Sequence, residues 1–137
     1  MQNFVPVLNE NMSKEQANML NPLVLAFVGD SVQTLYVRTK LVFLHDSKPH
    51  NLHNMASSEV KATAQAKVVQ AVMEQFTEDE MAVYKRARNS KIHTSAKNAG
   101  IIEYKKASGF EAVLGFLYLT NNNERLKYFL EWSEINE

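Results

Sequence analysis

The stretch Pro22-Leu23-Val24-Leu25-Ala26-Phe27-Val28-Gly29-Asp30-Ser31-Val32 opens a mainly apolar run that continues to about Leu44 without a turn signal. Asn21 followed by Pro22 is typical of a helix N-cap with proline in the first turn. The run contains several β-branched residues, but more than twenty residues without a break fit a helix better than a strand. The run therefore predicts one long helix. With only four glycines and three prolines in 137 residues, we expect an all-α chain.

Further helices are predicted on both sides of this run, and polar breaks separate them. A short first helix is expected to begin at the capping box Ser13–Gln16, and the long helix covers Pro22–Leu44. Residues 50–76 predict two helices with a break around Ser57 and Ser58. The last three helices are expected from the capping box Thr77–Glu80 to about Arg88, from Ile102 or Glu103 to Leu119, and from Glu124 to about Ile135. Residues 89–100 predict a long loop. The expected architecture is one all-α domain over residues 1–137, a bundle of about six or seven helices.

The composition excludes several classes of protein. The chain has no cysteine, which rules out disulfide frameworks, thiolate catalysis, iron–sulfur clusters and cysteine-bound zinc. Carboxylates and four histidines remain as metal ligands. The uninterrupted apolar stretches are much shorter than the roughly 20 residues of a membrane-spanning helix, and residues 1–11 do not resemble a signal peptide. A cytoplasmic protein without a membrane partner is the default expectation.

Charge is balanced overall but unevenly distributed. The sequence has 15 lysines and arginines and 15 aspartates and glutamates. Residues 84–106 alone hold seven basic residues and one glutamate, a net charge of +6, which leaves −6 on the rest of the chain. A basic block in an otherwise acidic chain indicates a polyanionic partner at one place on the surface. On charge alone, a solvated helix end and loop explains the block equally well.

Two carboxylates stand among apolar residues of predicted helices. Asp30 shares its helix face with mostly apolar neighbours and is expected to be buried, and the first cation on that helix, Arg38, is about 12 Å further along the axis. Glu111 has a similar environment on the second apolar helix. Each acid lies near a mid-helix glycine, Gly29 or Gly115, which allows helix backbones to approach closely. The simplest joint explanation is that the helices cross there and the acids share a hard divalent cation such as Mg²⁺.

The residues alone leave a second explanation of the acids open. A buried aspartate or glutamate can accept hydrogen bonds from the backbone or from a tyrosine hydroxyl, and both acids would then be structural. Ser31 and Ser108 lie near the acids, but neither has a histidine on the same helix face, which argues against a serine nucleophile.

Two segments read together resemble the two catalytic helices of the ribonuclease III endonuclease domain. They are Pro22–Val32, quoted above, and Gly109–Leu119 (GFEAVLGFLYL). The similarity continues in order through residues 52–56 (LHNMA), 61–67 (KATAQAK) and 85–91 (KRARNSK), and covers roughly Leu20 to Arg125. The chain is most similar to Mini-III, the short bacterial branch of this family.

The resemblance implies an all-α homodimer that hydrolyses double-stranded RNA with Mg²⁺, or with Mn²⁺ as a substitute. Asp30 and Glu111 would be the catalytic and metal-binding carboxylates. Typical family members carry two further acids, at positions that Ala26 and Ser108 occupy here. The resemblance also points to a precursor of the large-subunit ribosomal RNA as substrate and to a ribosomal protein as a further partner. The first catalytic helix would pair across the dimer, in the region of Val24, Phe27 or Val28.

RNA contacts are expected from the basic block, since these 137 residues leave no room for a separate double-stranded-RNA-binding domain. The candidates for phosphate contacts are Arg86, Arg88, Lys91 and Lys97, with Thr94 and Ser95 as hydroxyl donors and Lys67 as a weaker candidate from the preceding helix. The alternative function is that of a non-catalytic helical RNA-binding or ribosome-assembly protein, in which the acids are structural.

Overall fold

The computed structural model describes residues 10–45, 48–60, 62–90 and 100–135. Within these ranges it has seven α-helices, one 3₁₀ turn and no strand. The elements are α1 (Lys14–Asn18), α2 (Pro22–Leu44), α3 (Pro49–Val60), α4 (Ala62–Val72), η1 (Met73–Gln75), α5 (Glu78–Arg88), α6 (Gly100–Leu119) and α7 (Asn123–Ile135). The predicted all-α bundle is confirmed. None of the described helices combines the length and the apolar character needed to cross a membrane.

Local hydrogen bonds explain where several helices begin. The Asn21 side-chain oxygen accepts a hydrogen bond from the Leu23 amide at 2.8 Å, at the start of α2. At the start of α5, the Glu80 amide donates to the Thr77 hydroxyl at 3.2 Å and the Thr77 amide donates to the Glu80 carboxylate at 2.9 Å. Ser13 heads the same kind of capping box in α1. These caps satisfy amides that have no partner within their helix, and all three predicted starts are confirmed.

Two predicted boundaries are wrong by a few residues. The break expected at Ser57 and Ser58 does not occur there, because α3 continues to Val60 and α4 begins at Ala62. Serine has only a modest cost inside a helix, so two serines do not end one. The helix α6 begins at Gly100 and not at Ile102 or Glu103.

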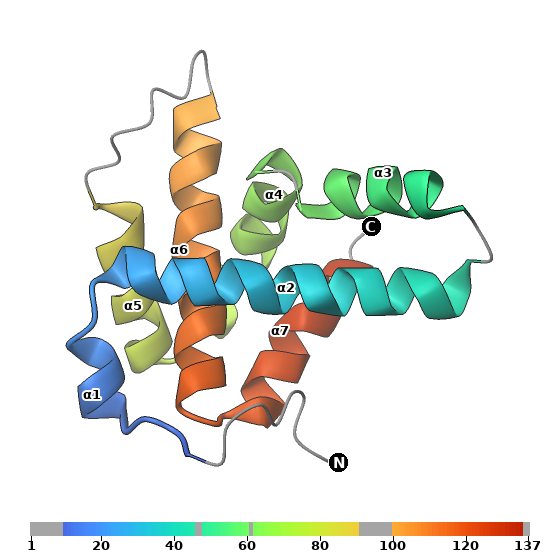
Figure 1. Ribbon diagram of the computed structural model, residues 1–137. Helices are drawn as coiled ribbons and strands as arrows, with labels where there is room; N and C mark the ends of the chain where they lie inside the picture. The colour runs from blue at the N-terminus through green and yellow to red at the C-terminus, as the bar shows by residue number, and fades with distance from the viewer. Residues whose placement is uncertain (1–9, 46–47, 61, 91–99, 136–137) are drawn as a thin grey trace.

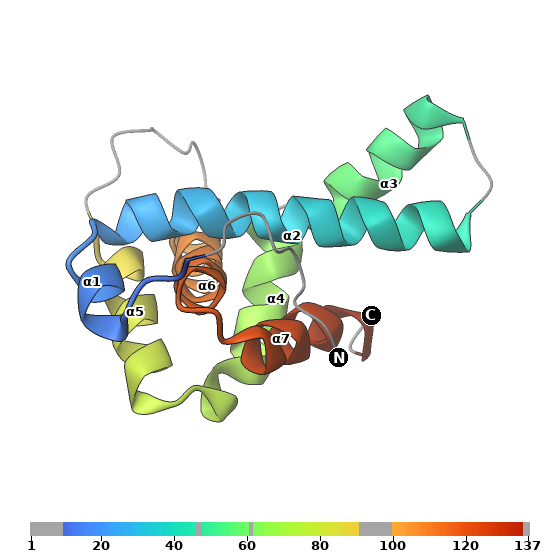
Figure 2. The ribbon, with the colours of Figure 1, turned by 60° about the horizontal axis from the view of Figure 1, so that its bottom comes forward.

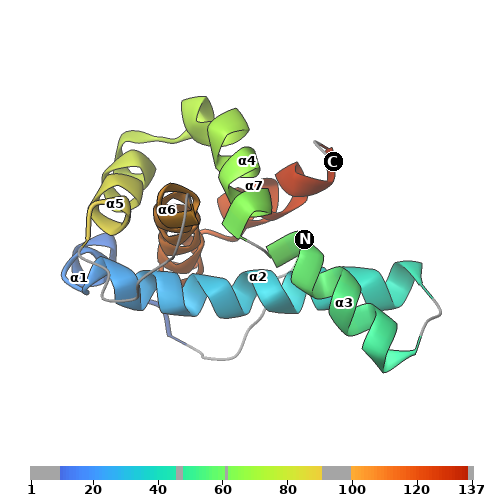
Figure 3. The same ribbon diagram turned by 90° about the horizontal axis from the view of Figure 1, so that it is seen from above.

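The helix α6 lies at the centre of the fold. It is crossed by α2, and α4 and α5 lie on either side of it (Figures 1 and 3). The helix α7 packs near its C-terminal end (Figure 2). From Ala107 to Leu117 every residue of α6 is buried except Glu111, which is partly exposed. An interior position is expected for a helix that is apolar on every side, and it makes the one carboxylate in this segment conspicuous.

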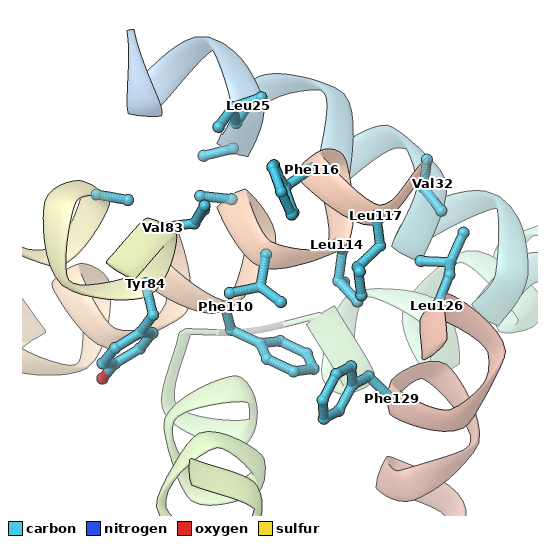
Figure 4. Close-up of a cluster of buried hydrophobic side chains, with 14 of the residues drawn as sticks. Leu25, Val32, Val83, Tyr84, Phe110, Leu114, Phe116, Leu117, Leu126 and Phe129 are labelled. Carbon is cyan, nitrogen blue, oxygen red and sulfur yellow. The ribbon is translucent and has the colours of Figure 1, made fainter. Parts of the chain in front are cut away.

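The main hydrophobic core surrounds α6 (Figure 4). Neighbouring helices contribute Leu25, Val32, Val83, Tyr84, Leu126 and Phe129, which pack against Phe110, Leu114, Phe116 and Leu117 of α6. The rings of Phe110 and Phe129 meet edge to face, with centroids 6.4 Å apart. A smaller cluster of Val37, Leu41 and Ala56 joins the second half of α2 to α3. The main core is therefore built around α6, and the first half of α2 packs against it.

Candidate active site

The helices α2 and α6 cross with their backbones in contact. A Cβ atom on Gly29 would collide with the carbonyl oxygen of Glu111, and a Cβ atom on Gly115 would collide with the carbonyl oxygen of Leu25. Only glycine fits at these two positions without a backbone shift. The predicted crossing at two glycines is confirmed, and it brings Asp30, the residue after Gly29, next to Glu111.

The carboxyl groups of Asp30 and Glu111 face each other at this crossing. Burial of Glu111, the negative charge of Asp30 and a hydrogen bond between the two carboxyl groups raise the pKa of Glu111 from 4.5 to about 8. A charged Glu111 would lose hydration and would lie beside a second carboxyl group, so its protonated form is favoured. Near neutral pH Glu111 therefore mostly keeps its proton.

The expectation that Asp30 is buried is wrong, because its side chain is exposed. The buried face of α2 consists of Leu25, Ala26, Gly29, Val32, Gln33, Val37 and Leu41. Asp30 lies at the edge of this face. The outer face of α2 is also apolar, with Phe27 76% exposed, so apolar periodicity does not distinguish the face that meets α6. An exposed edge position makes the Asp30 carboxylate accessible from solvent.

The helix α4 contributes a polar side chain to the acid pair. The Gln65 amide nitrogen donates a hydrogen bond to Glu111 Oε2 at 3.4 Å, and Gln65 is only 2% exposed. Sequence reasoning assigned no role to Gln65. The signal was present, because Gln65 shares its helix face with the buried residues Val69 and Val72, four and seven positions further on. A polar residue on an apolar stripe is the same signal that singles out the two acids.

The acid pair fits a hard divalent cation. Carboxylate oxygens are the ligands that Mg²⁺ and Mn²⁺ prefer, and a cation between Asp30 and Glu111 would offset the burial and the repulsion that raise the pKa of Glu111. The described residues contain no group of three or more histidines, aspartates or glutamates that could hold a metal. Ala26 and Ser108 are buried near the pair and supply no carboxylate. Two carboxylates suffice for Mg²⁺, which usually keeps several water ligands.

Arg86 and Arg88 lie near the end of α5, across α6 from α4 (Figure 3). The Arg86 guanidinium donates to the carbonyl oxygen of Leu20 at 3.1 Å and so holds the chain just before α2. The Arg88 guanidinium lies 5.5 Å from the centroid of the Tyr84 ring. Both arginines therefore have contacts within the fold, and their contact with RNA stays a prediction.

Other basic residues lie on the α4 side of α6. Lys67 is exposed on α4. The Lys106 ammonium of α6 donates to the side-chain oxygen of Gln70 on α4 at 3.0 Å, so it lies along the junction of the two helices, as Glu111 does. The predicted contacts at Lys91, Thr94, Ser95 and Lys97 fall outside the described residues. The described part of the basic block is thus divided between two sides of α6.

Comparisons with known proteins show which family the chain belongs to. Residues 23–122, which include both acids, match the family model of the ribonuclease III domain. The chain is 48% identical over 115 residues to the Mini-ribonuclease 3 of Enterococcus faecalis, a match that covers 82% of this chain and 87% of that protein. It is 46% identical over 123 residues to the Mini-ribonuclease 3 of Staphylococcus aureus, covering 88% and 92%.

A solved structure shows a similar fold. A crystal structure of a protein from Fusobacterium nucleatum superposes with a TM-score of 0.77 at 24% identity, over 86% of this chain and 94% of that one. The chain therefore belongs to the ribonuclease III family of endoribonucleases, in its Mini-ribonuclease 3 branch.

Proposed function

We propose that this endoribonuclease hydrolyses phosphodiester bonds of double-stranded RNA with Mg²⁺, or Mn²⁺ in its place, held by Asp30 and Glu111. The acid pair is the observation that carries this proposal. Burial and the neighbouring charge of Asp30 raise the pKa of Glu111, so a charged Glu111 opposes folding when no cation is bound. A purely structural role, as in a non-catalytic RNA-binding protein, leaves this destabilising contact unexplained. A metal site explains it, because a cation turns the repulsion into attraction.

The two acids have different roles in such a site. A bound divalent cation makes a water molecule more acidic and stabilises negative charge on the attacked phosphate. Asp30 is exposed to solvent, whereas Glu111 is partly buried on α6. Glu111 must release its proton before it binds a cation, so the proposed site fills more readily as the pH approaches 8.

The substrate we propose is a precursor of the large-subunit ribosomal RNA, processed in the cytoplasm, with a ribosomal protein as an additional partner. Proteins grip duplex RNA mainly by its shape and by contacts to its phosphates and 2′-hydroxyls. We assign the phosphate contacts to the cations proposed from the sequence, which are Arg86, Arg88, Lys91, Lys97 and Lys67, with Thr94 and Ser95 as hydroxyl donors. Lys106 adds a cation at the α4–α6 junction.

The outer face of α2 is proposed to pair with a second copy of the chain. Four apolar residues form a stripe along it, at between 45% and 76% exposure: Val24, Phe27, Leu35 and Val42. No described helix covers the first half of this face (Figures 1 and 3). Val28, by contrast, packs partly against the core. Two acid pairs related by a two-fold axis would match the two strands of an RNA duplex.

One experiment tests the proposed function directly. The purified chain is incubated with long duplex RNA, single-stranded RNA and duplex DNA, each with Mg²⁺ and with a chelator. We expect the duplex RNA to be cleaved when Mg²⁺ is present and not with the chelator, and we expect no cleavage of single-stranded RNA or duplex DNA. Asp30→Asn and Glu111→Gln are expected to bind RNA without cleaving it, while the exposed control Glu74→Gln cleaves normally. Near wild-type turnover by either acid variant in Mg²⁺ would refute the assignment.

A further inference from the structure

We infer that Gln65 is a positioning residue for Glu111: its amide fixes the orientation in which the Glu111 carboxylate meets the cation. This inference rests on the proposed function of the acid pair. It begins from the hydrogen bond between Gln65 Nε2 and Glu111 Oε2, which joins α4 to α6 at 3.4 Å. A glutamate side chain has several rotatable bonds, and a bond to one carboxyl oxygen limits its rotation while leaving other lone pairs for a cation.

The three polar side chains form a row from the interior to the surface. Gln65 is 2% exposed, Glu111 is partly buried and Asp30 is exposed. A cation that binds the acids from the solvent side would therefore have Gln65 behind Glu111. Residues in this place commonly orient metal-binding side chains, and their loss weakens metal binding although they do not touch the metal.

The helix α4 holds Gln65 firmly enough for this role. Val69 and Val72 on α4 are fully buried, and Ala66 is nearly so. Val69 and Val72 belong to the main core around α6. Packed helices position side chains more accurately than loops do, so the Gln65 amide is presented to Glu111 from a fixed backbone.

The chemistry of an amide suits this position better than that of a charged side chain. A lysine or arginine at residue 65 would neutralise Glu111 and compete with the cation. A glutamate would add a third acid beside Glu111, whose pKa is already raised by burial and by the charge of Asp30. Glutamine donates a hydrogen bond and leaves the net charge of the site unchanged.

The test removes the donor while keeping the shape of the side chain. Gln65→Met has a similar length and no N–H group. Metal binding is measured without RNA, as the Mn²⁺ concentration that gives half of the maximal thermal stabilisation. We expect this concentration to rise by about tenfold or more, and kcat for duplex RNA to fall with little change in KM. If Gln65→Met does not fold, Gln65→Ala provides the same measurement.

A matched control separates positioning from a general loss of core packing. Leu126→Val removes packing from the same core on α7, and Leu126 neither belongs to the acid site nor lies on α4. We expect Leu126→Val to melt at a lower temperature with an unchanged Mn²⁺ midpoint and an unchanged kcat. A wild-type Mn²⁺ midpoint in Gln65→Met, or an equal shift in Leu126→Val, would overturn the inference while leaving the proposed function intact. Failure of the proposed function looks different, because the wild-type chain itself would then neither cleave duplex RNA nor respond to Mn²⁺.

Discussion

Replacing Glu111 by glutamine should stabilise the folded protein while abolishing cleavage. The pKa of Glu111 is about 8 in the folded chain, against 4.5 for an unperturbed glutamate. Between these pH values the folded state binds one more proton than the unfolded state, so the free energy of unfolding falls as the pH rises. The shift corresponds to an upper limit of about 5 kcal/mol, at roughly 1.4 kcal/mol per pH unit. Because Glu111 is only partly buried and Asp30 is exposed, water reduces both the cost of burial and the repulsion, and we expect about 2–3 kcal/mol.

Thermal unfolding at pH 5 and pH 9, with chelator and at one protein concentration, measures this effect. An unfolding entropy of about 2 cal/mol/K per residue converts 2–3 kcal/mol into a Tm increase of roughly 7–10 °C for a chain of this length. We expect this advantage of Glu111→Gln at pH 9 and its near disappearance at pH 5, where the wild-type Glu111 keeps its proton. Mn²⁺ should stabilise the wild type at pH 9 and not the variant. The exposed control Glu74→Gln should change neither Tm. A Glu111→Gln variant that is no more stable than the wild type at pH 9, or equally favoured at both pH values, would refute the reasoning.

Three further predictions concern other parts of the molecule. Gly29→Ala is expected to lower the free energy of unfolding by about 3 kcal/mol or more, because its Cβ would meet backbone and not a movable side chain. A decrease below about 1 kcal/mol, measured by urea unfolding, would contradict the backbone contact. Light scattering should give twice the chain mass of 15.6 kDa for the wild type and close to one chain mass for Phe27→Glu, and a wild-type mass near 15.6 kDa would rule out the proposed dimer. A variant is neutralised at four cations together: Arg86, Arg88, Lys91 and Lys97. The slope of log binding constant against log salt concentration should become shallower by about one unit for each phosphate that the variant no longer binds. An unchanged slope would place the RNA elsewhere on the protein.

Helix positions that depend on local chemistry could be predicted from the sequence. Asn21 and Thr77 cap their helices through side chains within three residues, so the information is contained in a few adjacent letters. The buried face of α2 could not be predicted in the same way. That helix is apolar on both its inner and its outer face, and only its packing against α6 shows that Phe27 and Asp30 are exposed.

The candidate site was predictable where the sequence breaks a local preference. An acid and a glycine inside one apolar helix are both unfavourable there, and their occurrence in two helices pointed to the crossing of Gly29 and Gly115. The partners of Gln65 and Arg86 were not predictable. Their contacts, with Glu111 and with the Leu20 carbonyl, join residues 46 and 66 positions apart, and nothing local specifies such pairings.

The contact of main chains at Gly29 and Gly115 has a consequence for engineering. Where two peptide backbones touch, the spacing of the helices is set by main-chain atoms, which substitutions at positions other than the two glycines leave unchanged, and not by the volume of side chains between them. The large residues of the core away from this crossing, such as Leu126 and Phe129 of α7, can then be exchanged in volume-conserving combinations to raise heat resistance. Such variants would keep the relative position of Asp30 and Glu111, so thermal stability and catalytic rate can be optimised in separate rounds of selection.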